Sequence, residues 1–194
     1  MNPMLEDLIR KTRSCRRFYQ HHMVSHDTLT ALVNLARLSA SASNLQPIKY
    51  ILSCSERVNA DIFSCLGWAG YLPDWPGPAE GERPAAYIIM LHDTTISSEP
   101  GCDHGIAAQS MMLGARETGL GSCMIGSIDR NRLRDILDIP PHLNIPAVIA
   151  LGKPKETIVL ETIGTEESIR YWRDDQGIHH VPKRKLNDII LNRL

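Results

Sequence analysis

The sequence has no long hydrophobic run and no excess of positive charge. The apolar, strand-like run from Ile88 to Leu91 is far too short to cross a bilayer, and the N-terminal residues contain no apolar core of a secretory signal. The 21 lysines and arginines are balanced by 22 aspartates and glutamates, so the net charge is −1, whereas a general nucleic-acid binder carries a basic excess. We therefore expect a cytoplasmic protein with no membrane span and no nucleic-acid partner.

Several signatures of metal, nucleotide and nucleophile sites are also absent. The five cysteines include no C-x-x-C pair, which favours reduced thiols. The chain contains no G-x-S-x-G, H-E-x-x-H, G-x-x-x-x-G-K-[ST] or G-x-G-x-x-G motif. Gly119-Leu120-Gly121 resembles the last of these only superficially, because it follows a predicted helix and its spacing is wrong. Cys102-Asp103-His104 lacks a second ligand pair, so no metal site is predicted.

Length and periodicity indicate one α+β domain spanning residues 1–194. A chain of 194 residues with 43% hydrophobic residues can build one real core. Apolar residues recur at helical spacing in some stretches and form continuous runs in others. Helices are predicted over 5–12, 28–38, 58–66, 103–117, 129–137 and 185–194, and strands over 48–53, 85–92 and 147–151.

Two of these regions allow more than one interpretation. The helix predicted over 103–117 is apolar nearly all round, so it lies either under the sheet or at a subunit interface. Residues 67–84 are rich in proline and glycine, which forbid regular structure there. The aromatic residues of this segment, Trp68, Tyr71 and Trp75, favour a loop packed on the body of the domain. The alternative is a lid over a planar ligand.

Isolated histidines and one cysteine carry weaker signals. His21-His22, His26 and His179-His180 are interpreted as surface residues rather than ligands. Cys15 lies among arginines, so its pKa should be depressed if the thiol is exposed. Because no base partner for Cys15 is identifiable, we assign it no nucleophilic role.

Two short segments near the start suit a phosphorylated aromatic ligand. Arg13-Ser14-Cys15-Arg16-Arg17 gathers three guanidinium groups and a hydroxyl, and arginine grips phosphate through paired hydrogen bonds. The segment from Ser39 to Pro47 is small and polar, so a flat ring can approach its main chain while amides and hydroxyls bind the polar edge of the ring. A second basic cluster, at 183–185, also needs a local explanation in a chain without net positive charge.

Four motifs in order along the chain resemble those of the nitroreductase family of FMN-dependent flavoproteins. Arg13 to Phe18 resembles the family's Arg-Arg-Ser-x-Arg-x-Phe, and Ser39 to Pro47 resembles Ala-Pro-Ser-x-x-Asn-x-Gln-Pro-Trp. Gly119 to Gly126 resembles Gly-Leu-Gly-x-x-x-Ile-Gly. Gly152-Lys153-Pro154 and the later Pro182 to Lys185 resemble the family's Gly-x-Pro and basic C-terminal segment. Each motif is weak alone, but together they form a specific signal from about Leu8 to the end.

The resemblance implies a three-layer α/β/α sandwich around a mixed, mostly antiparallel sheet, assembled as an intertwined homodimer with two flavins at the interface. The helix at 103–117 would be the dimer helix. The basic segments would grip the FMN phosphate and ribityl chain, the segment at 40–46 would pack on the isoalloxazine, usually from the partner subunit, and 124–127 would lie near flavin N5. The implied cofactor-binding residues are Arg13, Ser14, Arg16, Ala40, Ser41, Ala42, Asn44, Gln46, Met124, Ile125, Gly126, Ser127, Lys183 and Arg184.

The implied activity is that of an oxidoreductase. NADH or NADPH would give a hydride to flavin N5 and leave, and a nitroaromatic, quinone or similar small acceptor would then take the electrons in the same pocket. One pocket used in turn explains the lack of a separate Rossmann site. No catalytic residue is assigned, because solvent can supply the protons.

Three departures from the family pattern leave alternatives open. Thr12 stands in place of the first arginine, Ala40 in place of the proline and Ile48 in place of the tryptophan. The principal alternative is therefore an FMN-binding protein with a storage or sensing role and little reductase activity. Within the enzyme class, the acceptor could also be a halogenated aromatic or the flavin itself. A metal- or disulfide-based binding module rests only on scattered cysteines and histidines.

Overall fold

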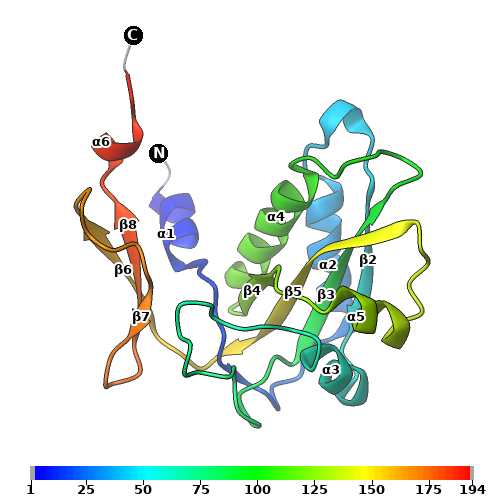
Figure 1. Cartoon of the computed structure of the whole chain (residues 1–194), viewed down its shortest axis with the longest axis horizontal. Helices are drawn as coiled ribbons and strands as arrows, with labels where there is room; N and C mark the ends of the chain where they lie inside the picture. The colour runs from blue at the N-terminus through cyan, green and yellow to red at the C-terminus, as the bar shows by residue number, and fades with distance from the viewer. Residues whose placement is uncertain (1–2, 193–194) are drawn as a thin grey trace.

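The computed structural model describes residues 3–192 and is built around an antiparallel sheet (Figure 1). Its central strands are β3 (Ala86–Asp93) and β5 (Leu143–Pro154), which pair with each other. β2 (Ile48–Ser53) pairs with β3, while β4 (Gly121–Ile125) and the short β1 (Phe18–Tyr19) both pair with β5. All these pairings are antiparallel. β3 is buried along its whole length, and the continuous apolar run that makes up most of it predicts this burial.

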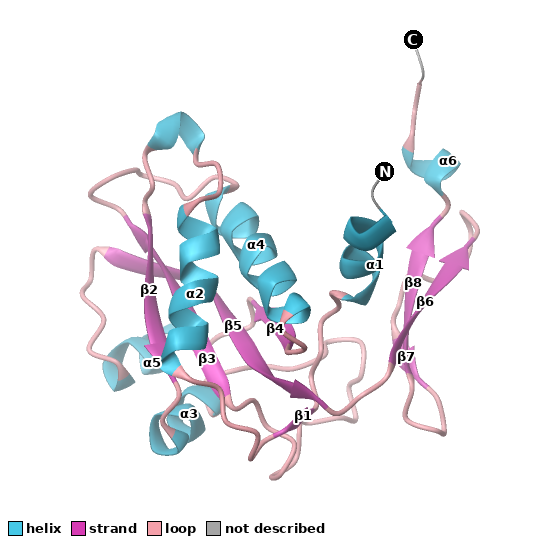
Figure 2. Cartoon of the chain, turned by 180° about the vertical axis from the view of Figure 1, so that it is seen from behind, coloured by secondary structure: helices cyan, strands magenta, loops and turns pink. Residues whose placement is uncertain are grey.

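Helices cover both faces of this sheet, which makes three layers (Figure 2). α2 (His26–Arg37) and α4 (Asp103–Glu117) pack on one face. α3 (Glu56–Phe63) and α5 (Arg130–Ile136) pack on the other. The predicted α/β/α sandwich is therefore confirmed for the single chain.

The alternation of side chains along β3 produces two cores. Ile88 and Met90 point to the side of α2 and α4, and both are 0% exposed. Tyr87 and Ile89 point to the opposite side, and both are also 0% exposed. Because successive strand residues face opposite sides of a sheet, a strand covered on both sides carries apolar residues at consecutive positions, as from Ala86 to Leu91.

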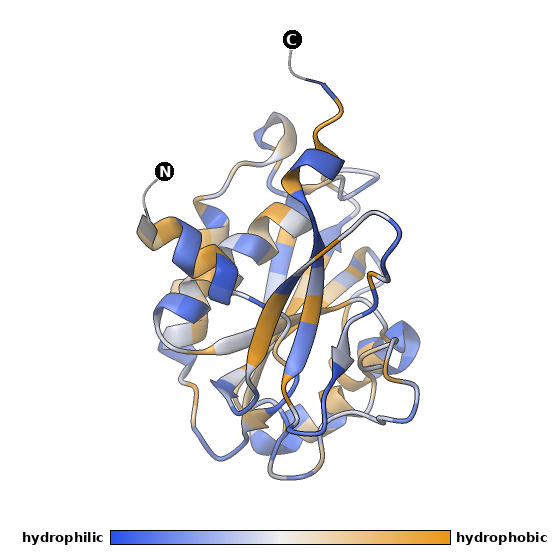
Figure 3. Cartoon of the chain, turned by 90° about the vertical axis from the view of Figure 1, so that its left-hand side faces the viewer, coloured by the Kyte–Doolittle hydropathy of each residue, from blue (hydrophilic) through white to orange (hydrophobic). Residues whose placement is uncertain are grey.

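A second sheet of three strands follows the main one. It consists of β6 (Ile158–Ile163), β7 (Trp172–Arg173) and β8 (His179–Arg184). β8 is central, parallel to β6 and antiparallel to β7. This C-terminal sheet stands to one side of the main sheet, beside α1 (Pro3–Lys11) (Figure 1). Its strands mix hydrophobic and hydrophilic residues (Figure 3), as expected for a sheet with one face partly open to solvent.

Most predicted elements agree with the structure, with one clear error at the C-terminus. The strand at 48–53 and the helix at 103–117 have the predicted bounds, and Gly119 follows α4 with φ +79°, the left-handed conformation of a helix C-terminus. The helix predicted over 185–194 is wrong: only α6 (Leu186–Ile189) forms, and residues 193 and 194 lie outside the described part. All four of its residues are exposed, and so short a helix gains little without packing.

Strands at 121–125 and within 158–184 were not predicted, because they are short or carry charged residues. Among the described helices, none combines the length and apolar character needed to span a bilayer.

Two glycines opposite each other in β4 and β5 let the N-terminal segment cross the sheet edge. Gly121 pairs with Gly152. A Cβ on Gly121 would lie 3.0 Å from the Cys15 Cβ and Sγ, and a Cβ on Gly152 would lie 3.0 Å from Cδ1 of the fully buried Phe18. At these distances an added Cβ would force its neighbours to move by a few tenths of an ångström.

We expect Gly152→Ala to destabilise the protein by about 1–3 kcal/mol, the usual cost of overpacking a core. The reason is that the added methyl group must displace the Phe18 ring, which is fully enclosed. Urea unfolding of the variant measures the change. Gly105→Ala is the control, since a Cβ there meets nothing within 4 Å; equal stability of the two variants would contradict the packing argument.

Candidate functional site

The N-terminal basic segment runs along the edge of β4, which holds it in place. The Thr12 hydroxyl donates a hydrogen bond to the Leu8 carbonyl of α1 (2.8 Å). Ser14 forms a parallel bridge with Ser122, and the Cys15 N–H donates to the Ser122 carbonyl (2.9 Å). Thr12, which replaces the first arginine of the motif, is thus engaged with its own helix and presents no charge.

Basic residues from both ends of the chain line one cavity of about 270 Å³, which we call the basic cavity. Arg13 and Arg16 come from the N-terminal segment, and Lys183 comes from β8. Within the described part of the chain, no carboxylate is among its lining residues. The other lining residues are Thr12, Ser14, Gln109, Met112, Tyr171, His179 and Val181. Three cations without a counter-charge in the lining suit a phosphate group.

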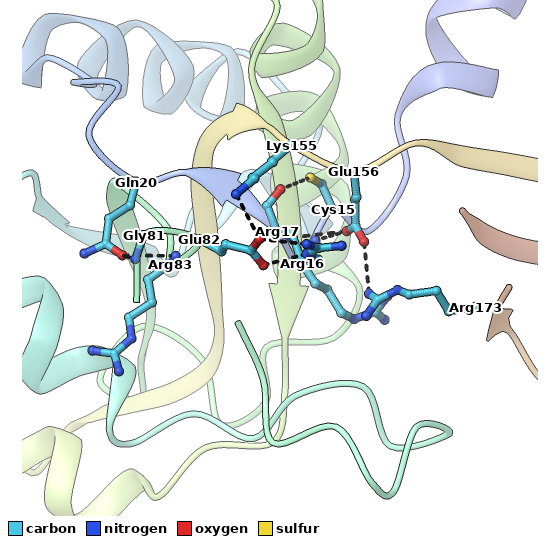
Figure 4. Close-up of polar contacts among 10 residues, drawn as sticks. All are labelled: Cys15, Arg16, Arg17, Gln20, Gly81, Glu82, Arg83, Lys155, Glu156 and Arg173. Atoms are coloured by element: carbon cyan, nitrogen blue, oxygen red, sulfur yellow. Dashed lines mark hydrogen bonds and ion pairs between the residues drawn. The ribbon is translucent and has the colours of Figure 1, made fainter. Parts of the chain in front are cut away.

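The arginines of this segment have different environments. The Arg17 guanidinium donates to Glu82 from Nε (2.6 Å) and Nη2 (2.7 Å), and the Lys155 ammonium lies 2.9 Å from the same carboxylate (Figure 4). These hydrogen bonds, the one from Arg17 first, lower the pKa of Glu82 to about 2. By contrast, no carboxylate among the described residues lies within ion-pair distance of the Arg16 guanidinium. Arg17 therefore has a structural role in an ion pair, while the unpaired charge of Arg16 is available to bind a ligand.

Arg13 supplies a direct test of whether a phosphate fits. Its Nη2 donates to the Ile9 carbonyl (2.9 Å), which orients the side chain. Its Nε is buried and has no hydrogen-bond partner among the described residues. A buried donor without a partner costs about 1–3 kcal/mol, and an anion in the basic cavity would offer it an acceptor. The donor set of this cavity therefore fits the phosphate of FMN.

The buried carboxylate of Glu156 ties the basic segment to the C-terminal sheet. It accepts hydrogen bonds from the backbone N–H groups of Arg16 and Arg17 and from Nη2 of Arg173 on β7 (3.1 Å) (Figure 4). Its side chain is 0% exposed. Glu156 thus fixes the main chain that carries Arg16.

A second cavity, of about 280 Å³, adjoins the basic cavity at Arg16 and Tyr171, which line both. We call it the Met124 cavity. A Cβ on Gly67 would lie 2.5 Å from the Ser127 Oγ, so glycine alone permits this close approach. Main chain and small side chains make up much of the wall, which suits a planar ring. Its other lining residues are Trp68, Ala69, Gly70, Cys123, Met124, Ile125 and Gly126.

The aromatic residues of the loop at 67–84 pack on the body, as one of the two interpretations predicts. Trp68 packs against Phe63, with ring centroids 5.7 Å apart. Tyr71 packs against Tyr171 (4.9 Å), and the Arg173 guanidinium lies over the Trp75 ring (4.7 Å). Trp68 also lines the Met124 cavity, so this packed loop forms part of the site wall.

The segment at 40–46 lies at a separate place in the single chain. Ala40, Ser41 and Gln46 line a cavity of about 250 Å³, the Ser41 cavity, which shares no lining residue with the other two. Asp103, at the start of α4, accepts hydrogen bonds from the Ser41 hydroxyl (2.5 Å) and the Ala42 N–H (3.0 Å). The segment is therefore anchored on α4.

This segment also contains the densest backbone strain in the described chain. Ser43, Asn44 and Gln46 have φ values of +50°, +55° and +53°, which non-glycine residues adopt infrequently. The Gln46 N–H donates to the Ser41 hydroxyl (2.9 Å), which helps hold this conformation. Strained backbone of this kind clusters at ligand sites, so the segment is a candidate half-site.

The structure thus brings together part of the predicted set. The residues around the two adjoining cavities are Arg13, Ser14, Arg16, Met124, Ile125, Gly126, Ser127 and Lys183. Those outside them within one chain are Ala40, Ser41, Ala42, Asn44, Gln46 and Arg184. Arg184 is exposed at the end of β8.

Two single-residue interpretations need correction. Cys15 is 2% exposed, so the condition for a depressed pKa is not met; burial, and then the charge of Glu156, raises the pKa of its thiol. His179 is not a surface residue, because it is only 1% exposed and lines the basic cavity. A signal for it existed in the alternation of β8, since His179, Val181 and Lys183 share one side of the strand and all line that cavity.

The buried position of His179 predicts an acid-sensitive fold. Burial, and then the positive charges of Arg16, Arg173 and His180, lower its pKa to about 4. Unfolded histidine titrates near pH 6.5, so between about pH 6.5 and 4 the unfolded chain takes up a proton that the folded chain does not. We expect the neutral, buried His179 to lower the free energy of unfolding by on the order of 2–3 kcal/mol as the pH falls through this window. Urea unfolding of the wild type and His179→Gln at pH 6.5 and 4.5 measures the difference.

His180 provides the opposite control. Its hydrogen bonds to Asp174 first, and to Glu161, raise the pKa of its imidazole. Its stabilising contribution is therefore complete below pH 6.5 and lost as the pH rises through the raised pKa. His180→Gln should lose stability mainly at low pH, and a parallel response of the two variants would contradict the assignment.

The described residues contain no group of three or more histidine, cysteine, aspartate or glutamate side chains that could hold a metal ion.

Comparison with known proteins identifies the family. The sequence model of the nitroreductase family matches residues 9–67 and 79–153. Curated relatives from Archaeoglobus fulgidus and Methanothermobacter thermautotrophicus, both provisionally named NADH dehydrogenase/NAD(P)H nitroreductase, are 26% and 28% identical over 153 residues. The aligned part is 75% of this chain and 83% and 75% of the two relatives.

Solved structures show the same fold. An FMN-dependent nitroreductase from Clostridium difficile R20291 superposes with a TM-score of 0.64 at 21% identity, covering 77% of this chain and 87% of that one. A nitroreductase family protein from Clostridium novyi NT has a TM-score of 0.64 at 22% identity and covers 91% of this chain and 93% of that one. Since the family model matches most of its length, the chain belongs to the nitroreductase family.

Proposed function

We propose that the protein is an FMN-dependent oxidoreductase that takes reducing equivalents from NADH or NADPH and passes them to a small acceptor such as a nitroaromatic or a quinone. The observation that carries this proposal is the basic cavity, where Arg13, Arg16 and Lys183 converge with no carboxylate among the described lining residues. It adjoins the Met124 cavity, whose lining combines glycines and other small residues with the aromatic residues Trp68 and Tyr171. A charged end and a flat end match a phosphorylated aromatic cofactor.

The roles of the chain's own residues follow from these surroundings. Arg13, Arg16 and Lys183 would bind the phosphate, and the Ser14 hydroxyl would add a hydrogen bond. The stretch from Met124 to Ser127 would lie along the ring, where its main chain can donate hydrogen bonds. When bound, FMN supplies the redox chemistry, accepting a hydride from the nicotinamide and later giving electrons to the acceptor.

The second half of the proposal is a homodimer that completes the site. Ala40, Ser41, Ala42, Asn44 and Gln46 are outside the two adjoining cavities of their own chain, yet they form an anchored and strained segment. We propose that they contact the ring of a flavin bound mainly by the partner subunit. The five free cysteines are in keeping with a reducing compartment such as the cytoplasm.

Absorption spectroscopy of the purified protein tests the cofactor. Peaks of an oxidised flavin, released on denaturation and identified as FMN, are the expected result. Oxidation of NADH or NADPH in the presence of a quinone then separates a reductase from a protein that only stores or senses flavin. A colourless protein that does not bind added FMN would overturn the proposal.

Light scattering tests the assembly. We expect twice the 21.7 kDa mass of the chain. A monomer that still holds FMN would contradict a flavin shared between two subunits.

A further inference from the structure

Arg16 is held by neutral groups only, which is unusual for a partly buried arginine. Its Nη1 donates to the Ser14 carbonyl (3.3 Å) and lies 3.3 Å from Nε2 of His179. Its guanidinium carbon lies 4.8 Å from the centroid of the Tyr171 ring. Among the described residues, none of the ion pairs involves Arg16, whereas the adjacent Arg17 is paired with Glu82.

The contact with His179 determines the state of that imidazole. A guanidinium can only donate hydrogen bonds, so Nε2 of His179 accepts and the proton resides on Nδ1. Nδ1 is buried and has no partner among the described residues. The low pKa of this histidine keeps it neutral at physiological pH. His179 therefore orients Arg16 and leaves its positive charge unpaired. A carboxylate at the same place would neutralise that charge.

Tyr171 is fixed in turn by two elements. Its hydroxyl accepts a hydrogen bond from the backbone N–H of Tyr71 in the 67–84 loop (3.3 Å), and the two tyrosine rings lie 4.9 Å apart. It also packs against the His179 ring (5.2 Å between centroids). The loop and β8 together thus hold the Tyr171 ring that faces Arg16. A cation over an aromatic ring is stabilised but keeps its charge.

Tyr171 and His179 both lie between residues 154 and 194, a stretch that the family model does not match. The part of the chain that this match leaves out therefore supplies the groups that orient an arginine of the matched N-terminal motif.

We propose that His179 and Tyr171 are positioning residues that hold the unneutralised Arg16 guanidinium for the phosphate of the bound cofactor. This inference rests on the proposed function, since it assumes that FMN places its phosphate in the basic cavity. It goes further in assigning the orientation of one phosphate-binding group to His179 of β8 and to Tyr171, which directly precedes β7.

The test compares FMN with riboflavin, which carries the same ring and no phosphate. Both flavins are titrated into apoprotein while the quenching of flavin fluorescence is followed. We expect His179→Phe, which keeps a ring but removes the acceptor, to weaken FMN binding about 10-fold, the scale of one charged hydrogen bond, and to leave riboflavin binding within about 2-fold. His179→Gln keeps an acceptor and should restore most of the FMN affinity. A purely structural role would weaken both flavins equally.

A double-mutant cycle links the effect to Arg16. If His179 acts through Arg16, the double variant that combines Arg16→Ala and His179→Phe should bind FMN no more weakly than the Arg16→Ala variant alone. Additive losses would overturn the positioning role. His180→Gln is the matched control on the same strand, because His180 pairs with Glu161 and Asp174 instead, and its ratio of FMN to riboflavin affinity should not change.

Further outcomes separate this inference from the proposed function. If His179→Phe does not fold, Tyr171→Leu removes the ring that faces Arg16 and should weaken FMN binding more than riboflavin binding. Tyr171→Phe keeps the ring and should change the ratio of the two affinities less. A wild-type protein that binds neither flavin would overturn the proposed function and this inference with it. FMN binding that depends on Arg16 but is unaffected by His179→Phe and Tyr171→Leu would overturn the positioning role alone.

Discussion

Arg16→Ala should weaken FMN binding by about 1.5–3 kcal/mol, the contribution of a charge-assisted hydrogen bond. The loss is expected because the guanidinium faces the basic cavity and is not neutralised by any carboxylate among the described residues. The dissociation constant is measured by titrating FMN into apoprotein at fixed ionic strength, since salt screens such contacts.

Arg10→Ala is the matched control for charge. Arg10 lies on α1, its side chain is 64% exposed, and it is not among the residues lining the basic cavity. Its replacement removes the same charge and should change FMN affinity little. Unchanged FMN affinity in Arg16→Ala would remove the basic cavity from consideration as the phosphate site.

Glu156→Leu is expected to be the most destabilising of the substitutions considered, by about 3–5 kcal/mol, as for other buried ion pairs that lose one partner. The carboxylate is fully buried and serves two backbone N–H groups and the Arg173 guanidinium. Leucine has similar volume but leaves these donors without an acceptor. Urea unfolding at neutral pH gives the free-energy difference.

The comparison variant is Glu166→Leu, which changes an exposed glutamate in the chain between β6 and β7. Surface substitutions of this kind usually stay within about 0.5 kcal/mol of the wild type. A Glu156 variant as stable as the Glu166 variant would mean that the buried carboxylate is not needed to hold the basic segment.

The main sheet and its two core faces were predictable because burial leaves a periodic record in the sequence. β3 is covered on both sides, so its residues from Ala86 to Leu91 form a continuous apolar run that is recognisable in the sequence. α2 shows one buried stripe, with Leu29, Leu32 and Ala36 at helical spacing, and Ser25 caps it by accepting the Thr28 N–H (3.1 Å). The C-terminal strands were missed because β7 has only two residues, while β6 and β8 carry charged residues that interrupt an apolar pattern.

Part of the candidate site was predictable for a similar reason. Arg13, Ser14 and Arg16 form a compact motif, and Lys183 belongs to a basic cluster without another explanation. The structure places all four along one cavity, and the binding of a phosphate there stays a prediction. The separation of the Ser41 segment from that cavity within one chain is compatible with the expectation that a partner subunit supplies it.

Sequence alone determined which residues carry charge, which stretches can be buried and which family motifs are present. Only the tertiary structure decided that Arg17 is neutralised by Glu82 while Arg16 is not. It also decided that His179 is buried against Arg16 although the adjacent His180 is bound to carboxylates. The physical reason is that the state of a charged or titratable group depends on its neighbours and its distance from water, and residues far apart in the sequence supply both.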